Sequence, residues 1–243
     1  CMPPASADAY RLVGASVKST YQVVGCQGSA PGVHAMSQTT RDRLLQEAEA
    51  LFAERGFYGV SINAVARGLS LTKQGLLHYF PTKEKLYAEV LKRAAAMLMA
   101  DLERRIGDLE DPVEQLMAAF DEVPISDPGM VRVARLLTRE LLDNPARAQR
   151  SQSWFLRPYL DRLESIVRDA QAAGFLGQVD PAAFVYHLIG ADQYFVISQA
   201  TLRQLRPRAE FEAHLANHDR ETRRAILAAL VTGRHEETSG NEH

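Results

Sequence analysis

Three helix N-caps in close succession constrain this 243-residue chain more than any other feature of its sequence. They lie in the stretch SINAVARGLSLTKQGLLHYFPTKEKLY, which runs from residue 61 to residue 87. Ser61, Thr72 and Thr82 each carry a hydroxyl that can accept a hydrogen bond from the first turn of a helix. Pro81 cannot continue the helix before it. The stretch therefore predicts two short helices and the start of a third, with tight turns between them.

Each of the two short helices has an apolar face, which indicates that it packs against a partner. On the first helix the apolar residues follow the spacing i, i+3, i+4 and i+7: Ile62, Val65, Ala66 and Leu69. On the second, Leu76 and Phe80 lie one turn apart and point inward, while the outer face is polar. A short helix that is held in this way, with hydrogen-bond donors at its N-terminal end, is typical of a helix-turn-helix.

The whole pattern resembles the DNA-binding domain of the TetR/AcrR family of transcriptional regulators. The resemblance covers about residues 39–93 and depends on LTKQGLLHYFPTKEKLY, on SINAVA before it, and on the preceding helix TTRDRLLQEAEALFAERGFYGV. The family usually has Ala-Gly in the turn where this chain has Leu69-Ser70. It usually has Tyr or Thr where this chain has Leu77 and Gly75. The resemblance implies an all-α fold with an N-terminal three-helix DNA-binding domain.

We predict a DNA-binding surface that consists of the N-caps and the outer residues of these helices: Ser61, Asn63, Thr72, Lys73, Gln74, Gly75, His78, Tyr79 and Lys83. Lys73 and Gln74 are predicted to contact base edges in the major groove, although on an isolated helix they would be solvated surface. Gly75 has no side chain to hold the helix away from DNA. Asn63 is assigned to a base or a phosphate. Five residues are assigned to phosphates: Ser61, Thr72, His78, Tyr79 and Lys83. The resemblance implies the phosphate role most strongly for Tyr79 and Lys83.

The charge of the chain is unevenly distributed, although its net value is only −2. Residues 36–105 carry 11 basic and 8 acidic side chains, whereas residues 106–243 carry 15 and 21. A basic N-terminal part agrees with DNA contacts at one end of the protein, although a small excess of this size is also ordinary scatter.

Composition predicts a cytoplasmic protein with no membrane partner. The chain is 46% apolar, which suits one or two soluble domains. No apolar run approaches about 18 residues, and the N-terminus lacks the pattern of a signal peptide. The only cysteines are Cys1 and Cys26. Neither a disulfide framework nor a cysteine-based zinc site is therefore expected in the core.

The spacing of apolar residues predicts an all-α chain, since no alternating strand pattern is present. We divide it into a disordered extension, a helix-turn-helix domain, a connecting helix, a helical effector-binding and dimerisation domain, and a flexible tail: residues 1–35, 36–83, 84–106, 107–233 and 234–243. Residues 1–35 either belong to the protein or lie upstream of a native start at Met36. The first helix is expected over residues 40–55. Those after residue 107 are expected over residues 112–122, 129–143, 153–173, 181–205 and 219–232.

The helix predicted over residues 181–205 is apolar on most of its circumference and therefore needs partners on more than one side. Gly190 and Ala191 allow close approach. The last helix offers a second apolar face: Ala225, Ile226, Ala229 and Leu230. The family resemblance implies that these two helices of each subunit form a four-helix bundle in a homodimer, although both faces can instead belong to the core of one chain.

A ligand cavity is predicted among the helices of the C-terminal domain. Its candidate residues are apolar or amphipathic: Met117, Phe120, Leu137, Leu141, Trp154, Phe155, Tyr159 and Tyr194. The alternative is that these residues form an ordinary core, as aromatic residues at helical spacing commonly do. Arg132, Arg135 and Arg139 share one helix face, where they either bind an anionic ligand or are solvated.

No pattern supports catalysis, a cofactor or a metal site. His214 and His218 have the i, i+4 spacing of a metal pair, but the run AHLANHD offers no clear third ligand. The sequence also lacks a glycine-rich phosphate loop, a nucleophile elbow and an HExxH motif. We therefore predict that the protein is not an enzyme.

The leading prediction is a homodimeric transcriptional repressor. The dimer binds a palindromic operator in double-stranded DNA, and a small, largely apolar effector releases it by favouring a state with wrongly spaced recognition helices. Two alternatives stay open. One is a DNA-binding protein without a small-molecule effector, and the other is a helical adaptor or enzyme that contains a helix-turn-helix. The sequence identifies neither the effector nor the operator.

Overall fold

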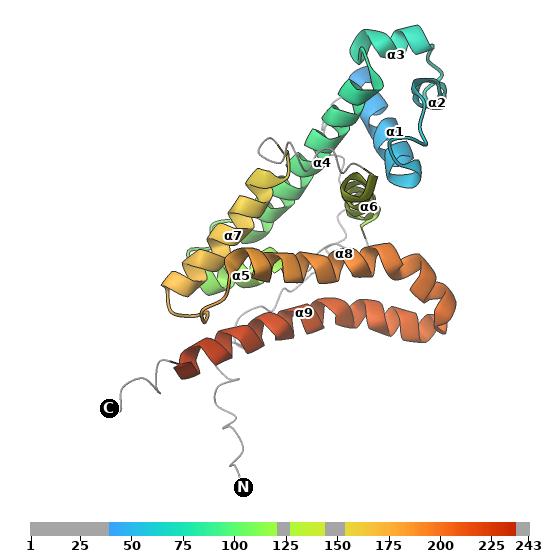
Figure 1. The fold of residues 1–243 in the computed structure, drawn as a ribbon. Coiled ribbons are helices and arrows are strands. Elements are labelled where there is room, and N and C mark those ends of the chain that lie inside the picture. Colours follow the sequence, from blue (N-terminus) through green and yellow to red (C-terminus); the bar gives the residue numbers. More distant parts are fainter. Residues whose placement is uncertain (1–38, 121–126, 144–153, 237–243) are drawn as a thin grey trace, which may run out of the picture. The chain divides into compact units, whose positions relative to one another are not determined.

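The computed structural model of the protein describes residues 39–120, 127–143 and 154–236, which lie in one compact unit (Figure 1). For several residues of the last helix it describes only the backbone. Throughout these residues the secondary structure is helical, with no strands, so the all-α prediction is confirmed. None of the helices is long and apolar enough to cross a membrane, as far as the described residues go.

The N-terminal helices begin where the sequence places their caps. They are α1 (Thr40–Arg55), α2 (Ile62–Gly68), α3 (Lys73–Tyr79) and α4 (Lys83–Ile106). Four hydroxyl groups accept a hydrogen bond from a backbone N–H of the first turn, at 3.1 to 3.2 Å: those of Thr39, Ser61, Thr72 and Thr82. Each bond satisfies a backbone donor that has no partner within its helix.

The turn between α2 and α3 has to form without the glycine that is usual in the family. Ser70 takes the left-handed conformation itself, with a φ of 56°. A residue other than glycine is strained in this region because its Cβ crowds the backbone. The apolar residues on either side hold the turn in place: Leu69 and Leu71 pack against the core that contains Val65, Ala66 and Leu76.

One hydrophobic core joins the N-terminal helices to α6 (Pro128–Asp143). Leu44, Phe52 and Leu76 are fully buried in it, together with Val133 and Leu136 of α6. This core holds α3 by its inner face, as the sequence predicts, and leaves the outer face exposed.

A second core lies among the remaining helices. These are α5 (Pro112–Phe120), α7 (Arg157–Ala172), α8 (Pro181–Leu205) and α9 (Arg208–Glu236). The core includes Leu102 of α4, Leu116 of α5, Ile166 of α7, Leu188 of α8 and Ile226 of α9. Since Ile226 is only 1% exposed within a single chain, its assignment to a dimer interface is wrong. The side chains of Ala229 and Leu230 lie outside the described residues.

The last helix begins at Arg208, eleven residues before its predicted start at Asp219. Between these positions the sequence is polar at most places, so its apolar period is weak. Two apolar contacts hold this part of the helix: Phe211 is buried, and Leu215 packs against the cluster that contains Phe195 and Val196. Tertiary packing therefore extends a helix that the sequence pattern underestimates.

Candidate DNA-binding surface and ligand cavity

The predicted DNA-binding residues lie together on α2, α3 and the start of α4. Seven are exposed, namely Ser61, Asn63, Thr72, Lys73, Gln74, His78 and Tyr79, while Gly75 and Lys83 are partly exposed. The fully buried Leu76 and nearly buried Phe80 face the opposite way, into the core. The short recognition helix is therefore anchored by its inner residues and presents its polar ones to solvent, as a helix-turn-helix requires.

The two N-caps on this surface retain a donor for DNA. The Ser61 hydroxyl oxygen accepts from the backbone N–H of Ala64, and that of Thr72 accepts from Gly75, both at 3.1 Å. A hydroxyl that accepts through its oxygen still has its own proton to donate. These side chains can therefore cap their helices and bind phosphate oxygens at the same time.

Aromatic rings hold two basic side chains near this surface. The Lys83 ammonium nitrogen lies 4.2 Å from the ring centroid of Phe57, and the Arg41 guanidinium lies 5.2 Å from that of Phe80. Arg41 also pairs with Glu89 at 2.6 Å. These contacts orient the cations and leave Lys83 partly exposed for a phosphate.

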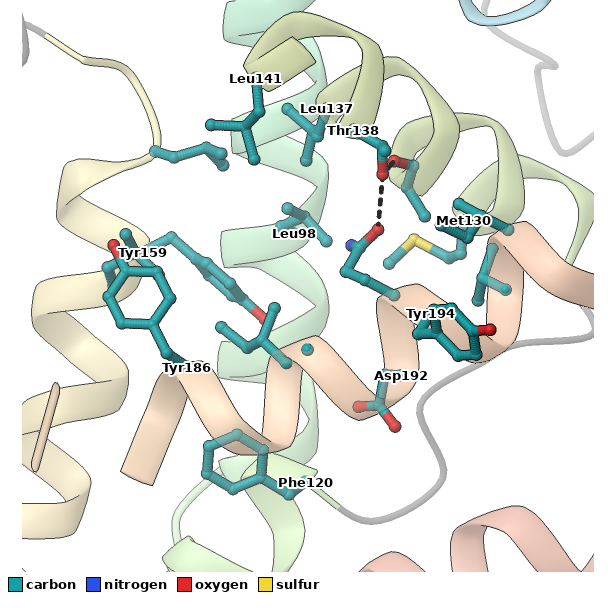
Figure 2. A pocket seen from close by; sticks show the side chains of 18 of the residues that line it. Leu98, Phe120, Met130, Leu137, Thr138, Leu141, Tyr159, Tyr186, Asp192 and Tyr194 are labelled. Atoms are coloured by element: carbon teal, nitrogen blue, oxygen red, sulfur yellow. Dashed lines mark hydrogen bonds between the residues drawn. The ribbon is translucent and has the colours of Figure 1, made fainter. Parts of the chain in front are cut away.

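A largely apolar cavity of about 450 Å³ lies among α4, α5, α6, α7 and α8 (Figure 2). Its volume falls in the range of small-molecule sites. Exposed side chains border it, among them Leu141, Leu142 and Tyr194, so it opens towards solvent. Trp154 also lines the cavity, and it is the only tryptophan in the sequence.

Six of the eight predicted ligand residues line this cavity: Phe120, Leu137, Leu141, Trp154, Tyr159 and Tyr194. The structure does not place Met117 and Phe155 in its wall. Met117 is buried in the second core, and Phe155 packs against the first. Spacing along a helix shows which residues are apolar, but it does not distinguish a side chain that faces a cavity from one that fills a core.

Sequence reasoning missed the polar part of the cavity wall. Thr138 of α6 donates from its hydroxyl to the Gln193 side-chain oxygen of α8 at 3.2 Å (Figure 2). Asp101 and Arg105 of α4 also line the cavity, and they form an ion pair at 3.0 Å. No sequence pattern marks polar residues that face inward, so only the tertiary structure identifies them.

Tyr159 reaches from α7 into the cavity, opposite Thr138 of α6 (Figure 2). Burial raises the pKa of its hydroxyl, and the positive charge of Arg105 offsets part of this rise. Removing the phenol from water disfavours its ionised form. Tyr159 is therefore a neutral phenol that can form hydrogen bonds at physiological pH.

Helix α6 lies between the cavity and the DNA-binding helices. Its residues Thr138, Leu141 and Leu142 face the cavity. The intervening Arg139 donates to the backbone oxygens of Ala53 and Glu54, at the end of α1, at 3.1 and 2.8 Å.

The next residue of α6, Glu140, is buried and accepts a hydrogen bond from the Tyr87 hydroxyl of α4 at 2.7 Å. One turn of α6 thus contacts the cavity on one side and both α1 and α4 on the other. Two turns earlier, Arg132 pairs with the buried Glu49 of α1 at 3.6 Å. Arg132 and Arg139 thus contact α1, whereas Arg135 is exposed.

The two histidines with metal-like spacing have other contacts. His218 of α9 lies 3.0 Å from a carboxylate oxygen of Asp192 and stacks on Phe195, with ring centroids 4.0 Å apart. His214 packs edge-on against the same phenylalanine. No group of three potential metal ligands occurs among the described residues.

Comparisons with known proteins agree with this geometry. The sequence model of "Bacterial regulatory proteins, tetR family" matches residues 44–90, from α1 into α4. Two HTH-type transcriptional regulators of Escherichia coli (strain K12), RutR and UidR, are each 24% identical to this chain. The RutR match covers 66% of this chain and 79% of RutR, and the UidR match covers 81% and 95%. The chain belongs to the TetR family.

A solved structure of the same fold is AibR in complex with isovaleryl coenzyme A and operator DNA. It has a TM-score of 0.53 and 22% sequence identity, and the match covers 64% of this chain and 85% of that one. As a TetR-family member, the present chain is a transcriptional regulator with a DNA-binding helix-turn-helix. Regulators of this family are DNA-binding proteins rather than enzymes.

Proposed function

We propose that this TetR-family regulator is a homodimeric repressor that binds a palindromic operator and releases it when a small molecule enters the cavity of the C-terminal helices. The observation that carries the proposal is the position of α6. This helix forms part of the cavity wall and also contacts α1 and α4 through Arg139 and Glu140.

The DNA-binding part of the proposal is supported by the exposed polar face of α3. Lys73 and Gln74 are assigned to base edges because both are exposed in the first turn of the recognition helix. Five residues are assigned to phosphates, with Tyr79 and Lys83 as the principal contacts: Ser61, Thr72, His78, Tyr79 and Lys83. In a dimer the two recognition helices would read half-sites about one turn of DNA, roughly 34 Å, apart.

The ligand-responsive part follows from the contacts of α6. A ligand that separates α6 from α7 and α8 would press on Thr138, Leu141 and Leu142, which belong to the same turn as Arg139 and Glu140. Displacement of this turn would move the ends of α1 and α4 that it holds, and with them α3. The resulting shift between two states can be no larger than the difference in the ligand's affinity for them.

The dimer is supported by apolar surface on α8. Tyr186, Tyr194 and Ile197 of this helix are 57%, 72% and 41% exposed. They alternate along the helix with the buried Leu188 and Val196, so one side of α8 packs within the chain while apolar residues remain on another. A second copy of the chain would cover these residues, as in two-fold symmetric bundles.

The experiment that tests the function is selection from random duplex DNA. Wild type should enrich a palindrome, and a Lys73→Ala/Gln74→Ala variant should lose it or alter its bases. Lys92→Ala serves as the control, because this exposed lysine pairs with Glu89 away from α3. If wild type enriches no sequence at low salt, or if the double variant enriches the same palindrome, the assignment of α3 as a recognition helix is wrong.

Two further measurements test the remaining parts. A reporter gene placed behind the enriched palindrome should be expressed less in cells that contain the protein, and activation would show the opposite sign of regulation. Sedimentation of wild type should give the mass of a dimer. A monomer at micromolar concentration would contradict the proposed use of α8.

A further inference from the structure

We infer that the cavity binds an uncharged, mainly apolar molecule whose polar atoms are hydrogen-bond acceptors, such as carbonyl oxygens. This inference rests on the proposed function, which makes the cavity the effector site, and it adds the chemical class of the effector.

Two charged residues of the cavity wall already have partners of opposite charge. Asp101 and Arg105 line the cavity but neutralise each other. The other carboxylate oxygen of Asp101 accepts from Arg104 at 2.6 Å, and Arg105 also donates to the backbone oxygens of Ala118 and Ala119. A carboxylate or an ammonium group in the ligand would have to displace these partners to gain an ion pair of its own.

The remaining charged residue of the wall is Asp192. It projects from α8 on the side away from Thr138, towards α9 (Figure 2). There it is bonded to His218, and its side chain is only 12% exposed. Every charged residue of the cavity wall therefore has a partner of its own, so far as the described residues form that wall. A charged ligand would lose its hydration without gaining a counter-ion, which is unfavourable in a largely apolar site.

Two side chains of the cavity wall can donate hydrogen bonds to a ligand, and the first is Tyr159. Tyr159 and Arg105 both line the cavity, where burial raises the pKa of the Tyr159 hydroxyl and the positive charge of Arg105 offsets part of this rise. Because an arginine has no acceptor, Arg105 does not take up the phenol proton. The proton of this buried phenol is then directed elsewhere. Because burial favours the neutral form, that proton stays on the oxygen.

Gln193 provides a second donor. Its side-chain oxygen lies 3.2 Å from the Thr138 hydroxyl, whose single proton is shared between this oxygen and the Ala134 backbone oxygen at 2.9 Å. No described residue accepts from the Gln193 amide nitrogen, although the side chain lines the cavity. The phenol and the amide thus both have hydrogen atoms to donate, which selects acceptors in the ligand.

The experiment uses four probes of similar shape, because the natural effector is unidentified. Benzylacetone carries a neutral carbonyl, and butylbenzene has no polar atom. Hydrocinnamate and the amine made by reductive amination of benzylacetone carry a negative and a positive charge. Each is titrated into the full-length protein while the fluorescence of Trp154 is followed, which reports on the cavity because this tryptophan lines it.

We expect benzylacetone to bind at least tenfold more tightly than either charged probe. Tyr159→Phe should weaken benzylacetone about tenfold, as the loss of one buried hydrogen bond predicts, and should change butylbenzene less than about threefold. Butylbenzene binding also shows that the variant is folded. Tyr58→Phe is the control, because this tyrosine is 77% exposed and does not line the cavity.

The outcomes separate this inference from the proposed function. Tighter binding of the amine or of hydrocinnamate overturns the inference, and so does an equal effect of Tyr159→Phe on benzylacetone and butylbenzene. Either result leaves the cavity as a small-molecule site. If none of the four probes binds, the cavity does not accept small apolar molecules, and the proposed effector site fails together with the inference.

Discussion

The hydrogen bond between Tyr87 of α4 and Glu140 of α6 offers the sharpest test of how the DNA-binding helices are joined to the cavity. Tyr87→Phe removes the hydroxyl that donates to Glu140 at 2.7 Å. The aromatic ring remains, with its contacts to Phe52 and Phe57 at centroid distances of 4.8 and 5.0 Å. The substitution therefore changes the hydrogen bond and leaves the packing almost intact.

The expected magnitude follows from burial. The two residues are 2% and 3% exposed, so water does not replace the lost partner. Leaving a buried hydrogen-bonding group without its partner costs about 1–3 kcal/mol, and we expect Tyr87→Phe to lower the free energy of unfolding by roughly 2 kcal/mol. Glu140→Gln keeps an acceptor and should cost less. The double variant should be less destabilised than the sum of the two, because both changes act on the same bond.

The assay is urea unfolding, followed by Trp154 fluorescence and by helix content at one fixed protein concentration. Tyr58→Phe is the control. This tyrosine is 77% exposed, so its hydroxyl should contribute less than about 0.5 kcal/mol. If Tyr87→Phe costs no more than this control, or if the double-variant effects are additive, the bond does not hold α4 to α6. In that case α6 cannot transmit ligand binding through Glu140.

Three further predictions concern the N-terminal helices. Gly75→Ala should raise the free energy of unfolding by about 0.5 kcal/mol, since the new Cβ would meet the Thr72 hydroxyl oxygen only at an ordinary 3.4 Å. The same substitution should weaken DNA binding in a fluorescence-anisotropy titration. Unchanged affinity would show that Gly75 does not approach DNA. Ser70→Gly should stabilise the protein by roughly 0.5–1 kcal/mol in thermal unfolding, because it relieves a φ of 56°, and a loss of stability would refute the strain. The hydrogen bond from Lys92, and after it the one from Arg41, lowers the pKa of Glu89. The ionised Glu89 therefore stabilises the folded protein above pH 4.5, and this contribution is lost as the pH falls through the lowered pKa. Glu89→Gln should therefore cost less than about 1 kcal/mol at neutral pH, and its difference from wild type in unfolding should disappear in acid rather than grow.

The helix-turn-helix could be predicted almost completely from the sequence. Its caps act within three residues along the chain, and the apolar spacing of each helix identifies the face that packs inward. The structure has α1 and α4 where Thr39 and Thr82 predict their starts. The turn at Ser70 also depends on neighbouring residues along the chain, because the chain has to reverse there whether or not a glycine is present.

The cavity was predicted only in part, for a physical reason. Phe120 and Met117 lie one turn apart on the same helix and are equally apolar, yet Phe120 lines the cavity while Met117 fills the core. Which of the two faces a cavity depends on how neighbouring helices pack, and that packing joins residues far apart in the sequence.

By itself, then, the sequence determined the N-terminal helices, the exposed face of α3 and the family, because these follow from short-range hydrogen bonds and from periodic burial. The tertiary structure alone decided the roles of Arg139, Tyr159 and Gln193. As sequence features they are an arginine, a tyrosine and a glutamine on helices. Only when α6 meets α1, and α7 and α8 meet the cavity, does the arginine bind the end of α1 while the other two become donors to a ligand. Contacts of this kind span tens of residues, and no local pattern encodes them.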